Sequence, residues 1–406
     1  MLDFDEALRI CRELGQELAL RDAEEVDLAE AAGRVLAEDV TALLPVPRED
    51  YSAMDGYAVR LAEVALERPM RVSGESRPGR PLPTFEPGAA IRIFTGGAVP
   101  SGADAVIMQE NARREGDQVT FTSLPRPFEN VRRAGEDLKV GELALGRGAR
   151  LDGAKLSLLA MLERRRVRVV RRPKVAILCT GDELRPPLDL REVTPPSEVS
   201  GLAESNSFGL RELLRHAGGA PLERVLVADE PEALQGELKG ALETCDAIVT
   251  VGGASVGDHD WARPVLTGLG AQILVPKVRM KPGKPFFLAN CRGVPIVGLP
   301  GNPSSAHITF ALLGVPFVRA LSGATESEQE LLKVRLPLLT PFRQKPGRRN
   351  FLRARVGASG VEILENQASG AATSLAWANA LVVVPEEVSQ LAARDLVEVV
   401  LLGGLG

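Results

Sequence analysis

Three apolar runs in this chain lead directly into loops built from glycines, carboxylates and small polar residues. VAILCT (175–180), CDAIVTV (245–251) and VPIVGLP (294–300) are followed by GDEL, GGASVGDHD and GNPSS. Glycines such as Gly252 and Gly253 leave backbone N–H groups open to an anion, and a following helix terminus adds partial positive charge. The loops therefore predict a site for phosphate or another oxyanion. Their spacing does not indicate a Ser-His-Asp or Cys-His arrangement.

Lysine is used sparingly, and three lysines stand close together. The chain has nine lysines among its 49 basic residues, and Lys277, Lys281 and Lys284 all fall in KVRMKPGK. In a chain that otherwise uses arginine, compact ammonium groups here favour an oxyanion site. The alternative is an exposed turn that happens to be basic.

Carboxylates supply the opposite charge at the same loops. Asp182 and Glu183 follow the first apolar run, and Asp258 and Asp260 follow the second. Four carboxylates beside an anion cradle are unfavourable unless a cation or a hydrogen-bond donor meets them. Their oxygens suit Mg²⁺ bridging phosphate groups, with Zn²⁺ as the alternative metal. We therefore predict a metal site formed by these four residues.

The elements that position these loops have an α/β pattern. Over residues 173–325, continuous apolar strands alternate with helical stretches such as SFGLRELLRHAG and EPEALQGELKGALE. This pattern is typical of a doubly wound, mainly parallel sheet covered on both faces. Ligands of such sheets bind outside the carboxyl ends of the strands, so the three loops are expected to converge on one crevice.

The rest of the chain predicts three further parts around this central domain. Residues 1–22 and 143–172 are expected to form a helical linker region, and residues 23–142 form an inserted β-rich module with many Pro and Gly turns. Residues 330–406 return to short strands and predict a small β-barrel-like domain. The predicted fold class is multidomain α/β plus β.

Composition excludes several classes of protein. The 406 residues carry a net charge of -5, which gives no general attraction to nucleic acid. We identify no apolar stretch near the roughly 20 residues that a membrane helix needs, and the acidic amino terminus does not resemble a secretory signal. Four scattered cysteines predict buried thiols and a reducing cytoplasm.

Longer motifs resemble those of the molybdopterin molybdenumtransferase family. TGDEL, ESNSFGL, VGGASVGDHD, KPGKPF and GLPGNPSSA occur in the family's order, and YSAMDGYAV, FTGGAVPSGADAVIMQE and RRAGEDLKVGE extend the likeness to the amino-terminal part. The resemblance implies a homodimer that converts adenylylated molybdopterin and molybdate to molybdenum cofactor and AMP with a divalent metal. It also implies contacts with molybdopterin adenylyltransferase or apo-molybdoenzymes.

The resemblance assigns roles to individual residues. The catalytic groups it implies are Asp55, Thr95, Asp137, Glu183, Lys277 and Lys281. The implied substrate-binding residues of the α/β domain are Thr180, Gly181, Asp182, Asn206, Asp229, Gly252, Gly253, Ser255, Lys284, Gly301, Asn302, Pro303, Ser304 and Ser305. At the molybdate end it adds Arg349, Arg353 and Ser369. The contributors from the β module, Asp55, Thr95 and Asp137, are expected to act across the dimer interface.

Two other functions stay open at this point. A molybdopterin adenylyltransferase-like enzyme would share the α/β domain and would activate molybdopterin with ATP. The SAMDGYA motif, the GED loop and the β tail of this chain are additions that the adenylyltransferase lacks. A non-catalytic molybdopterin-binding or scaffold protein is the second alternative, and no extra segment here favours it. The residues do not distinguish molybdate from tungstate.

Overall fold

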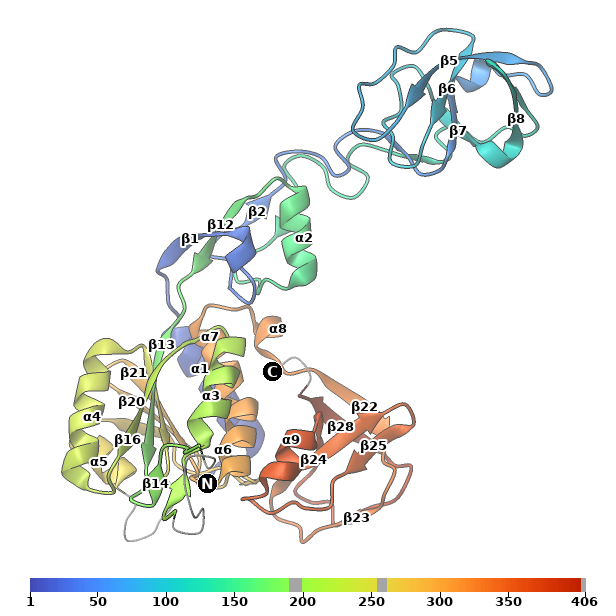
Figure 1. Ribbon diagram of the computed structural model, residues 1–406. Helices are drawn as coiled ribbons and strands as arrows, with labels where there is room; N and C mark the ends of the chain where they lie inside the picture. Colours follow the sequence, from blue (N-terminus) through green and yellow to red (C-terminus); the bar gives the residue numbers. More distant parts are fainter. Residues whose placement is uncertain (190–198, 254–260, 403–406) are drawn as a thin grey trace. The chain divides into compact units, whose positions relative to one another are not determined.

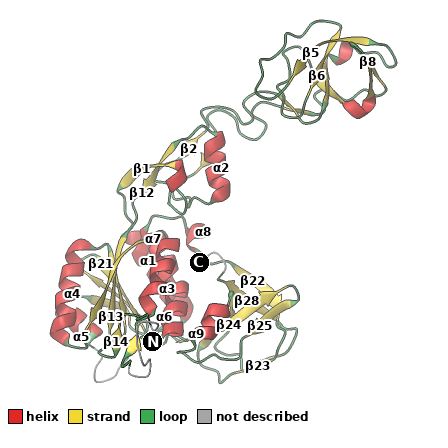
Figure 2. Cartoon of the chain, viewed as in Figure 1, coloured by secondary structure: helices red, strands yellow, loops and turns green. Residues whose placement is uncertain are grey.

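A computed structural model describes residues 1–189, 199–253 and 261–402 of the chain. The chain forms two compact units, whose elements are shown in Figures 1 and 2. The larger unit contains Met1–Glu38, Arg147–Asp152 and the residues from Arg166 onward, and the smaller unit contains Asp39–Gly146 and Gly153–Arg165.

A six-stranded sheet forms the centre of the larger unit, with the order β16-β13-β17-β21-β20-β18 (Figure 1). Strands β16, β13, β17 and β21 pair in parallel, whereas β20 is antiparallel to both of its neighbours. In sheet order the strands are Ala220–Val227, Lys174–Thr180, Ala247–Val251, Val294–Leu299, Phe287–Cys291 and Gln272–Val275. The predicted α/β sheet is confirmed.

One hairpin in this sheet departs from the purely parallel pattern. Strands β20 and β21 are joined by Arg292 and Gly293, which have φ values of 54° and 87°. Two successive positive φ values are typical of the tight turns that join antiparallel strands. The Asn290 side chain accepts the Gly293 N–H at 3.0 Å and stabilises this turn.

Helices cover both faces of the sheet because alternate strand residues are apolar on both sides. On strand β13, Val175, Ile177 and Cys179 pack into one apolar layer, and Ala176 and Leu178 pack into the other. The first layer includes α1 (Phe4–Glu17), α3 (Asn206–His216), α6 (Pro303–Thr309) and α7 (Val315–Leu321), and the second includes α4 (Pro231–Thr244) and α5 (Ala262–Gly268). This arrangement matches the doubly wound prediction.

A long apolar helix lies inside the first of these layers. A π-helical turn at Phe310–Gly314 joins α6 to α7, so the helical run extends over Pro303–Leu321. By length and composition alone this run is long enough to cross a membrane, which differs from the expectation that the chain has no apolar stretch of that length. Within the structure 94% of an 18-residue window of this run is buried. A helix that is apolar on all sides is expected where protein surrounds it, so we interpret it as a core helix.

A second sheet follows in the larger unit, with the order β19-β24-β26-β28-β22 and with β25 paired to β24. Its strands are β19 (Met280–Lys281), β24 (Arg349–Gly357), β26 (Ala380–Val384), β28 (Leu396–Leu401), β22 (Lys333–Pro337) and β25 (Gly360–Ile363). The carboxyl-terminal part also contains α8 (Glu326–Gln329), β23 (Phe342–Arg343), α9 (Ala372–Trp377) and β27 (Gln390–Leu391). Strand β19 lies in the KVRMKPGK segment, and its Lys281 is the register partner of Asn350. The lysine segment is therefore attached to the carboxyl-terminal sheet.

The expected helical linker at 143–172 is helical only in part. Helix α2 (Gly153–Met161) lies between β11 (Leu143–Leu145) and β12 (Arg166–Val170). Strand β12 pairs with β1 (Ala23–Asp27), and Arg166 and Val170 occupy the two ends of this antiparallel pairing. The basic residues there alternate with buried valines, which is the pattern of a strand with one solvated face.

The smaller unit contains a six-stranded sheet of short strands, ordered β7-β4-β6-β5-β9-β8. These are Ala105–Met108, Gly56–Val59, Ala89–Ile93, Met70–Ser76, Gln118–Phe121 and Ala112–Glu115. Two-stranded pairings connect β2 (Val40–Thr41) with β11, and β3 (Tyr51–Ser52) with β10 (Val131–Arg132). Tyr57 and Ala58, neighbours on β4, belong to different apolar clusters, so this sheet is packed on both faces.

Candidate functional site

The loops after β13, β17 and β21 meet at one edge of the central sheet. Gly252 has a φ of 90°, and a Cβ atom there would lie 2.6 Å from the carbonyl and hydroxyl oxygens of Thr180. A Cβ on Gly301 would lie 3.7 Å from the Gly252 Cα. The Asn206 side chain donates a hydrogen bond to the Gly301 carbonyl at 2.8 Å. The loops therefore converge, and glycine is required at Gly252, where the loop after β17 meets the end of β13.

A cavity of about 300 Å³ lies at this junction, which we call the strand-end cavity. Its lining includes the predicted residues Thr180, Glu183, Asn206, Gly301, Asn302 and Pro303. The short strands β14 (Leu184–Arg185) and β15 (Leu202–Ala203) form part of its wall. Carbonyl, amide and hydroxyl groups dominate the polar lining, so the cavity suits a neutral polar group or a phosphate held by backbone groups.

Two of the four predicted metal ligands are described, and both lie near these strand ends. The Asp182 carboxylate accepts the backbone N–H of Asp229 at 2.9 Å. Glu183 lines the strand-end cavity, and its carboxylate lies over Gly181, within 2.9 Å of where a Cβ would be. Asp258 and Asp260, like Ser255, fall outside the described residues. Within 1–189, 199–253 and 261–402, no group of three His, Cys, Asp or Glu side chains is placed to hold a metal.

A larger cavity of about 730 Å³ adjoins the first, and Asn302 lines both. We call it the cationic cavity, because the positively charged side chains that line it are Lys281, Lys284, Arg343, Lys345, Arg348 and Arg353. Its described lining contains no Asp or Glu, and none of the six cations forms an ion pair with a described carboxylate. Six like charges around one space repel each other unless an anion enters. The cavity is therefore suited to an oxyanion.

Local backbone geometry brings the lysines to this cavity. Lys281 ends β19, and Lys284 follows a turn at Gly283, whose φ is 104°. A Cβ on Gly283 would lie 2.3 Å from the Thr309 hydroxyl oxygen, so the turn requires glycine. The predicted Lys281 and Lys284 thus both line the cationic cavity. Lys277 lines neither cavity, and its backbone carbonyl accepts the Leu2 N–H at 2.9 Å.

Arg353 and Ser369, two residues expected at the molybdate end, both line the cationic cavity. The Arg353 side chain is only 2% exposed and donates to the carbonyls of Asn366 and Ala368 at 3.0 Å each. Burial lowers the pKa of Arg353, although a guanidinium stays charged at neutral pH. The Ser369 carbonyl accepts the Ser304 N–H at 3.2 Å, which connects this loop to the start of α6.

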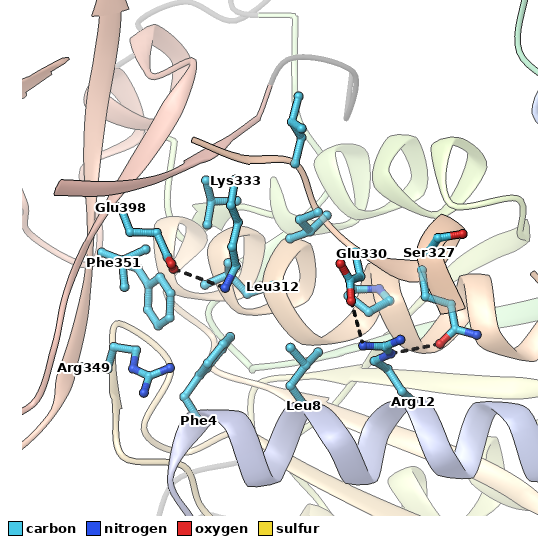
Figure 3. Close-up of a pocket in the computed structure, with 16 residues that line it drawn as sticks. Phe4, Leu8, Arg12, Leu312, Ser327, Glu330, Lys333, Arg349, Phe351 and Glu398 are labelled. Carbon is cyan, nitrogen blue, oxygen red and sulfur yellow. Dashed lines mark hydrogen bonds and ion pairs between the residues drawn. The ribbon is translucent and has the colours of Figure 1, made fainter. Parts of the chain in front are cut away.

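Two predicted substrate-binding side chains are placed elsewhere. Arg349 lines a different cavity (Figure 3), where its guanidinium contacts both Asp5 carboxylate oxygens at 2.7 and 2.8 Å and Glu386 at 3.3 Å. These carboxylates raise the pKa of Arg349 and occupy its donors, so the structure does not place its guanidinium with Arg353 and Ser369, and its role as a ligand contact stays a prediction. The buried Ser304 hydroxyl donates to the Ala371 carbonyl at 2.8 Å, so it connects the start of α6 to the residues before α9.

Several residues of the cationic cavity were not predicted from the sequence. Arg343, Lys345, Arg348 and Asn350 come from FRQKPGRRN, in the carboxyl-terminal part. The signal available in the sequence was four cations within seven residues around a Pro-Gly pair. Such clusters are usually solvated loops, and only the pairing of β24 with β19 shows that this one faces the lysine segment.

The remaining predicted residues lie in the smaller unit. The Asp55 carboxylate accepts the backbone N–H and the hydroxyl of Thr95 at 2.8 and 2.9 Å, and these hydrogen bonds lower the pKa of Asp55. Thr95 is exposed and Asp55 is half-buried, so the pair presents an ionised carboxylate near the surface. Asp137 forms a 2.6 Å ion pair with Arg132. No contact in the described part of the chain joins Asp137 to Asp55 or Thr95.

Taken with the doubly wound sheet, the glycine-lined strand ends and the adjoining cationic cavity define a class of protein. They are the features of an α/β protein whose cavities are suited to a phosphate-bearing ligand beside a second oxyanion.

Comparison with known proteins identifies the family. The MoeA N-terminal region (domain I and II) matches residues 2–162, the probable molybdopterin binding domain matches 176–320, and the MoeA C-terminal region (domain IV) matches 335–402. Relatives called molybdopterin molybdenumtransferase are similar in sequence. That of Nostoc sp. is 38% identical over 325 residues, 78% of this chain and 73% of the relative. That of Bacillus subtilis is 33% identical over 403 residues, 95% of this chain and 90% of the relative.

Solved structures agree with the sequence comparison. The crystal structure of a molybdopterin biosynthesis moeA protein from Pyrococcus horikoshii OT3 has a TM-score of 0.80 and 28% sequence identity, covering 99% of this chain and 100% of that one. The chain belongs to the molybdopterin molybdenumtransferase (MoeA) family.

Proposed function

We propose that this protein transfers molybdenum from molybdate to adenylylated molybdopterin and releases AMP and molybdenum cofactor. The observation that carries the proposal is the cationic cavity, with six cations and no described carboxylate in its lining. Because the cationic cavity lies beside the strand-end cavity, an oxyanion and a phosphate-bearing substrate could bind next to each other. The family relatives carry the name of this activity.

Molybdate would bind in the cationic cavity. It is a tetrahedral dianion, and Lys281, Lys284 and Arg353 offer it charge-assisted hydrogen bonds, while the Ser369 hydroxyl offers a neutral donor. Because the lining holds six cations and no described carboxylate, the cavity attracts the dianion. Neutralising its charge also favours its approach to a second anionic substrate.

The adenylylated molybdopterin would bind with its phosphates near the strand ends. Gly252 and Gly301 keep the backbone open there, and Asn206 fixes the Gly301 carbonyl. The sulfur atoms that take molybdenum belong to the pterin substrate, so the protein needs no nucleophile of its own. Its contribution is to position two anions and to neutralise their charge.

A divalent metal, Mg²⁺ with Zn²⁺ as the alternative, would be held by Asp182, Glu183, Asp258 and Asp260. The described half of this set fits, because Asp182 and Glu183 follow a strand end and Glu183 lines the cavity. The metal would supply charge neutralisation for the phosphoanhydride. We expect chelation to stop turnover, and Glu183→Gln to raise the Mg²⁺ concentration needed for half-maximal activity while melting stays unchanged. An unchanged Mg²⁺ requirement would remove Glu183 from the metal site.

In a homodimer, the Asp55, Thr95 and Asp137 surface of one subunit would complete the site of its partner. Asp55→Ala and Lys281→Ala are each expected to abolish turnover in a folded protein. If the two groups act across the interface, mixed and reassociated variants regain activity, because half of the dimers carry one intact site. The expected recovery is about a quarter of wild-type activity per subunit. No recovery in verified mixed dimers would place both groups on the same subunit's site.

The cell context follows from the same proposal. The protein would act in the cytoplasm, and it would receive its substrate from a molybdopterin adenylyltransferase or pass the product to apo-molybdoenzymes. Its charge and cavities give no reason to expect nucleic acid or a membrane as partner.

The experiment that tests the proposal is AMP release from adenylylated molybdopterin by the purified protein with Mg²⁺. It is run with and without molybdate, and reconstitution of an apo-molybdoenzyme is followed in parallel. We expect AMP release that requires molybdate, together with active cofactor. Tight pterin binding without either product would indicate a carrier or scaffold, and ATP-dependent adenylylation of molybdopterin would indicate an adenylyltransferase.

A further inference from the structure

One short segment of the carboxyl-terminal part supplies half of the positive charges that line the cationic cavity. Arg343, Lys345 and Arg348 lie in this segment. All three side chains are exposed, and none of them forms an ion pair or a side-chain hydrogen bond with a described residue. We call these three residues the cation rim. Arg353, in the same lining, is by contrast only 2% exposed and is held by two backbone carbonyls.

The backbone that carries the cation rim is fixed by hydrogen bonds at both of its ends. Arg343 belongs to β23, which pairs with β27, and the Gln344 N–H donates to the Ser389 carbonyl at 2.9 Å. Further along, the Gly347 N–H donates to the Glu386 carbonyl at 2.8 Å. A free surface loop would let like charges move apart, whereas this backbone keeps three of them close together at the cavity.

The carboxylates next to the cation rim do not neutralise it. The Glu386 carboxylate is paired with Arg349 at 3.3 Å, and Glu387 is exposed and does not line the cavity. The whole chain carries a net charge of -5, so at long range the protein repels a dianion. The cation rim provides a local field of the opposite sign where the cationic cavity is open to solvent.

A single tetrahedral oxyanion cannot contact all six cations of this cavity. It has four oxygens, and a cavity of about 730 Å³ is much larger than such an ion. Lys281, Lys284 and Arg353 already provide charged contacts, and Ser369 adds a neutral one. Exposed cations in water gain little from a direct ion pair. Their field still extends over about 8 Å at physiological salt, so it acts on an anion before the anion is bound.

We propose that the cation rim steers small dianionic oxyanions into the cationic cavity and is not itself their binding site. The inference rests on the proposed function only for the identity of the natural anion, molybdate. An attractive field at the opening raises the rate at which a dianion reaches the inner cations. The field leaves the contacts of the bound anion unchanged, so the dissociation rate changes little. The rim residues thus act on entry, and the inner cations act on retention.

Neutralising the cation rim tests this role. The triple variant Arg343→Gln, Lys345→Gln and Arg348→Gln keeps long polar side chains and removes three charges. Calorimetry on the full-length protein gives the molybdate dissociation constant at ionic strengths of about 10 mM and about 1 M, where the Debye length is about 30 Å and about 3 Å. We expect the variant to bind about tenfold more weakly than wild type at the lower ionic strength. At the higher ionic strength the two proteins should agree within about twofold.

The rates of binding show which step has changed. Association and dissociation of radiolabelled molybdate are followed by rapid filtration at the lower ionic strength. The rim variant should associate about tenfold more slowly than wild type, and its dissociation rate should stay within about twofold. Sulfate, a tetrahedral dianion too, should lose affinity by the same factor as molybdate, because a field responds to charge and not to the identity of the anion.

A second triple variant controls for the change in net charge. Arg292→Gln, Arg335→Gln and Arg394→Gln also removes three exposed charges that have no ion pair with a described residue. Arg335 lies on β22, at the sheet edge opposite β19, and the Arg394 N–H donates to Leu338, directly after β22. Arg292 precedes β21, at the end of that strand away from the two cavities. This variant should bind molybdate within about twofold of wild type at both ionic strengths.

A residue that contacts the anion should respond to salt in a different way. Lys281→Gln removes a charge-assisted hydrogen bond, which acts at short range and is screened less than the field of the rim. This variant should therefore remain at least about tenfold weaker than wild type at about 1 M ionic strength. The comparison of Lys281→Gln with the rim variant separates contact from steering.

The outcomes distinguish this inference from the proposed function. If the rim variant binds as tightly as wild type at low ionic strength, or if its loss of affinity persists at about 1 M, steering is overturned and the proposed function stands. Equal losses in the two triple variants would also overturn it, since net charge alone would then explain them. If the protein binds sulfate with the expected dependence on the rim but does not bind molybdate, the proposed function fails and the role of the rim stands.

Discussion

Strand β24 contributes an arginine to each of two cavities, and the two arginines differ in whether a carboxylate pairs with them. Arg349 lies in the cavity of Figure 3, about 480 Å³ in volume, and is paired with Asp5 and Glu386. Arg353, four positions later on the same strand, lines the cationic cavity and has only backbone carbonyls as partners among the described residues. The same residue type is thus neutralised in one cavity and left charged in the other.

In the cavity of Figure 3, each cation of the lining is paired with a carboxylate. Lys333 pairs with Glu398 at 3.1 Å, and Arg12 contacts Glu330 at 3.5 Å. Its floor is apolar, with side chains such as Phe4, which packs against Phe351 at a ring-centroid distance of 4.7 Å. Paired cations over an apolar floor hold the amino-terminal helix to the carboxyl-terminal sheet. Unpaired cations reduce stability, and a fold tolerates them where a ligand completes them.

The largest expected difference between the two cavities concerns their lysines. Lys281→Ala is expected to lower molybdate-dependent turnover at least about a hundredfold, because it removes a charge-assisted contact to the oxyanion. Lys333→Ala removes an exposed ion pair in the other cavity and should leave turnover within about twofold. Steady-state AMP release by both variants measures the contrast. Equal losses of turnover in the two variants would show that Lys281 matters no more for activity than the paired Lys333.

Replacing Arg353 tests whether an unpaired buried cation serves binding rather than stability. Arg353→Met is expected to weaken molybdate binding by about 10- to 100-fold, the usual cost of a lost charged hydrogen bond. The melting temperature should change little, because the lost bonds to the carbonyls of Asn366 and Ala368 are offset by removing a buried charge. Calorimetry with molybdate and thermal melting provide the two readouts. A large drop in melting temperature with normal molybdate binding would make Arg353 a structural residue.

Arg349→Met, the same substitution four positions earlier, should give the reverse result. It breaks a bidentate pair with Asp5 and a contact to Glu386, while methionine keeps the packing over Phe4. We expect a loss of about 1–2 kcal/mol in the free energy of unfolding and near-normal molybdate affinity. Urea unfolding and calorimetry measure these effects. Weakened molybdate binding in a stable protein would return Arg349 to the site.

The contrast between these two arginines also shows how far sequence reasoning reaches. The central sheet was predictable because continuous apolar strands and helical periods are local patterns, and Gly252 and Gly301 lie where such strands must end. The ion pair of Arg349 was not predictable from the sequence, since its partner Asp5 lies 344 positions away in the chain. A motif gives residue types and order, but only the packed structure shows which cations have been neutralised.

The missed residues have the same explanation. The place of Asn350 in the cavity wall carries no sequence signal, because its hydrogen bond to Gln344 depends on the two backbone carbonyls that hold the Gln344 side chain. The hairpin at Arg292 and Gly293 was missed although its two-residue turn is local. Local turn chemistry could have found the hairpin, whereas no local pattern could have found the amide pair.

The smallest expected effect concerns the acid dependence of the paired cavity. In this cavity the hydrogen bond that Arg349 donates to the Asp5 carboxylate lowers the pKa of Asp5 below the ordinary value of 3.8. A carboxyl group with a lowered pKa stabilises the fold above its unfolded-state pKa, and that contribution is lost as the pH falls through the lower folded-state pKa. Asp5 is largely exposed, so the contribution should be a fraction of a kcal/mol.

Asp5→Asn should therefore be slightly less stable than wild type near about pH 6, and this difference in the free energy of unfolding should disappear below about pH 4. Urea midpoints across this range measure it, and in the Arg349→Met background the gap should be absent at every pH, because the interaction that creates it has been removed. A gap that persists there would trace the effect to the start of α1 instead of to the Arg349 pair.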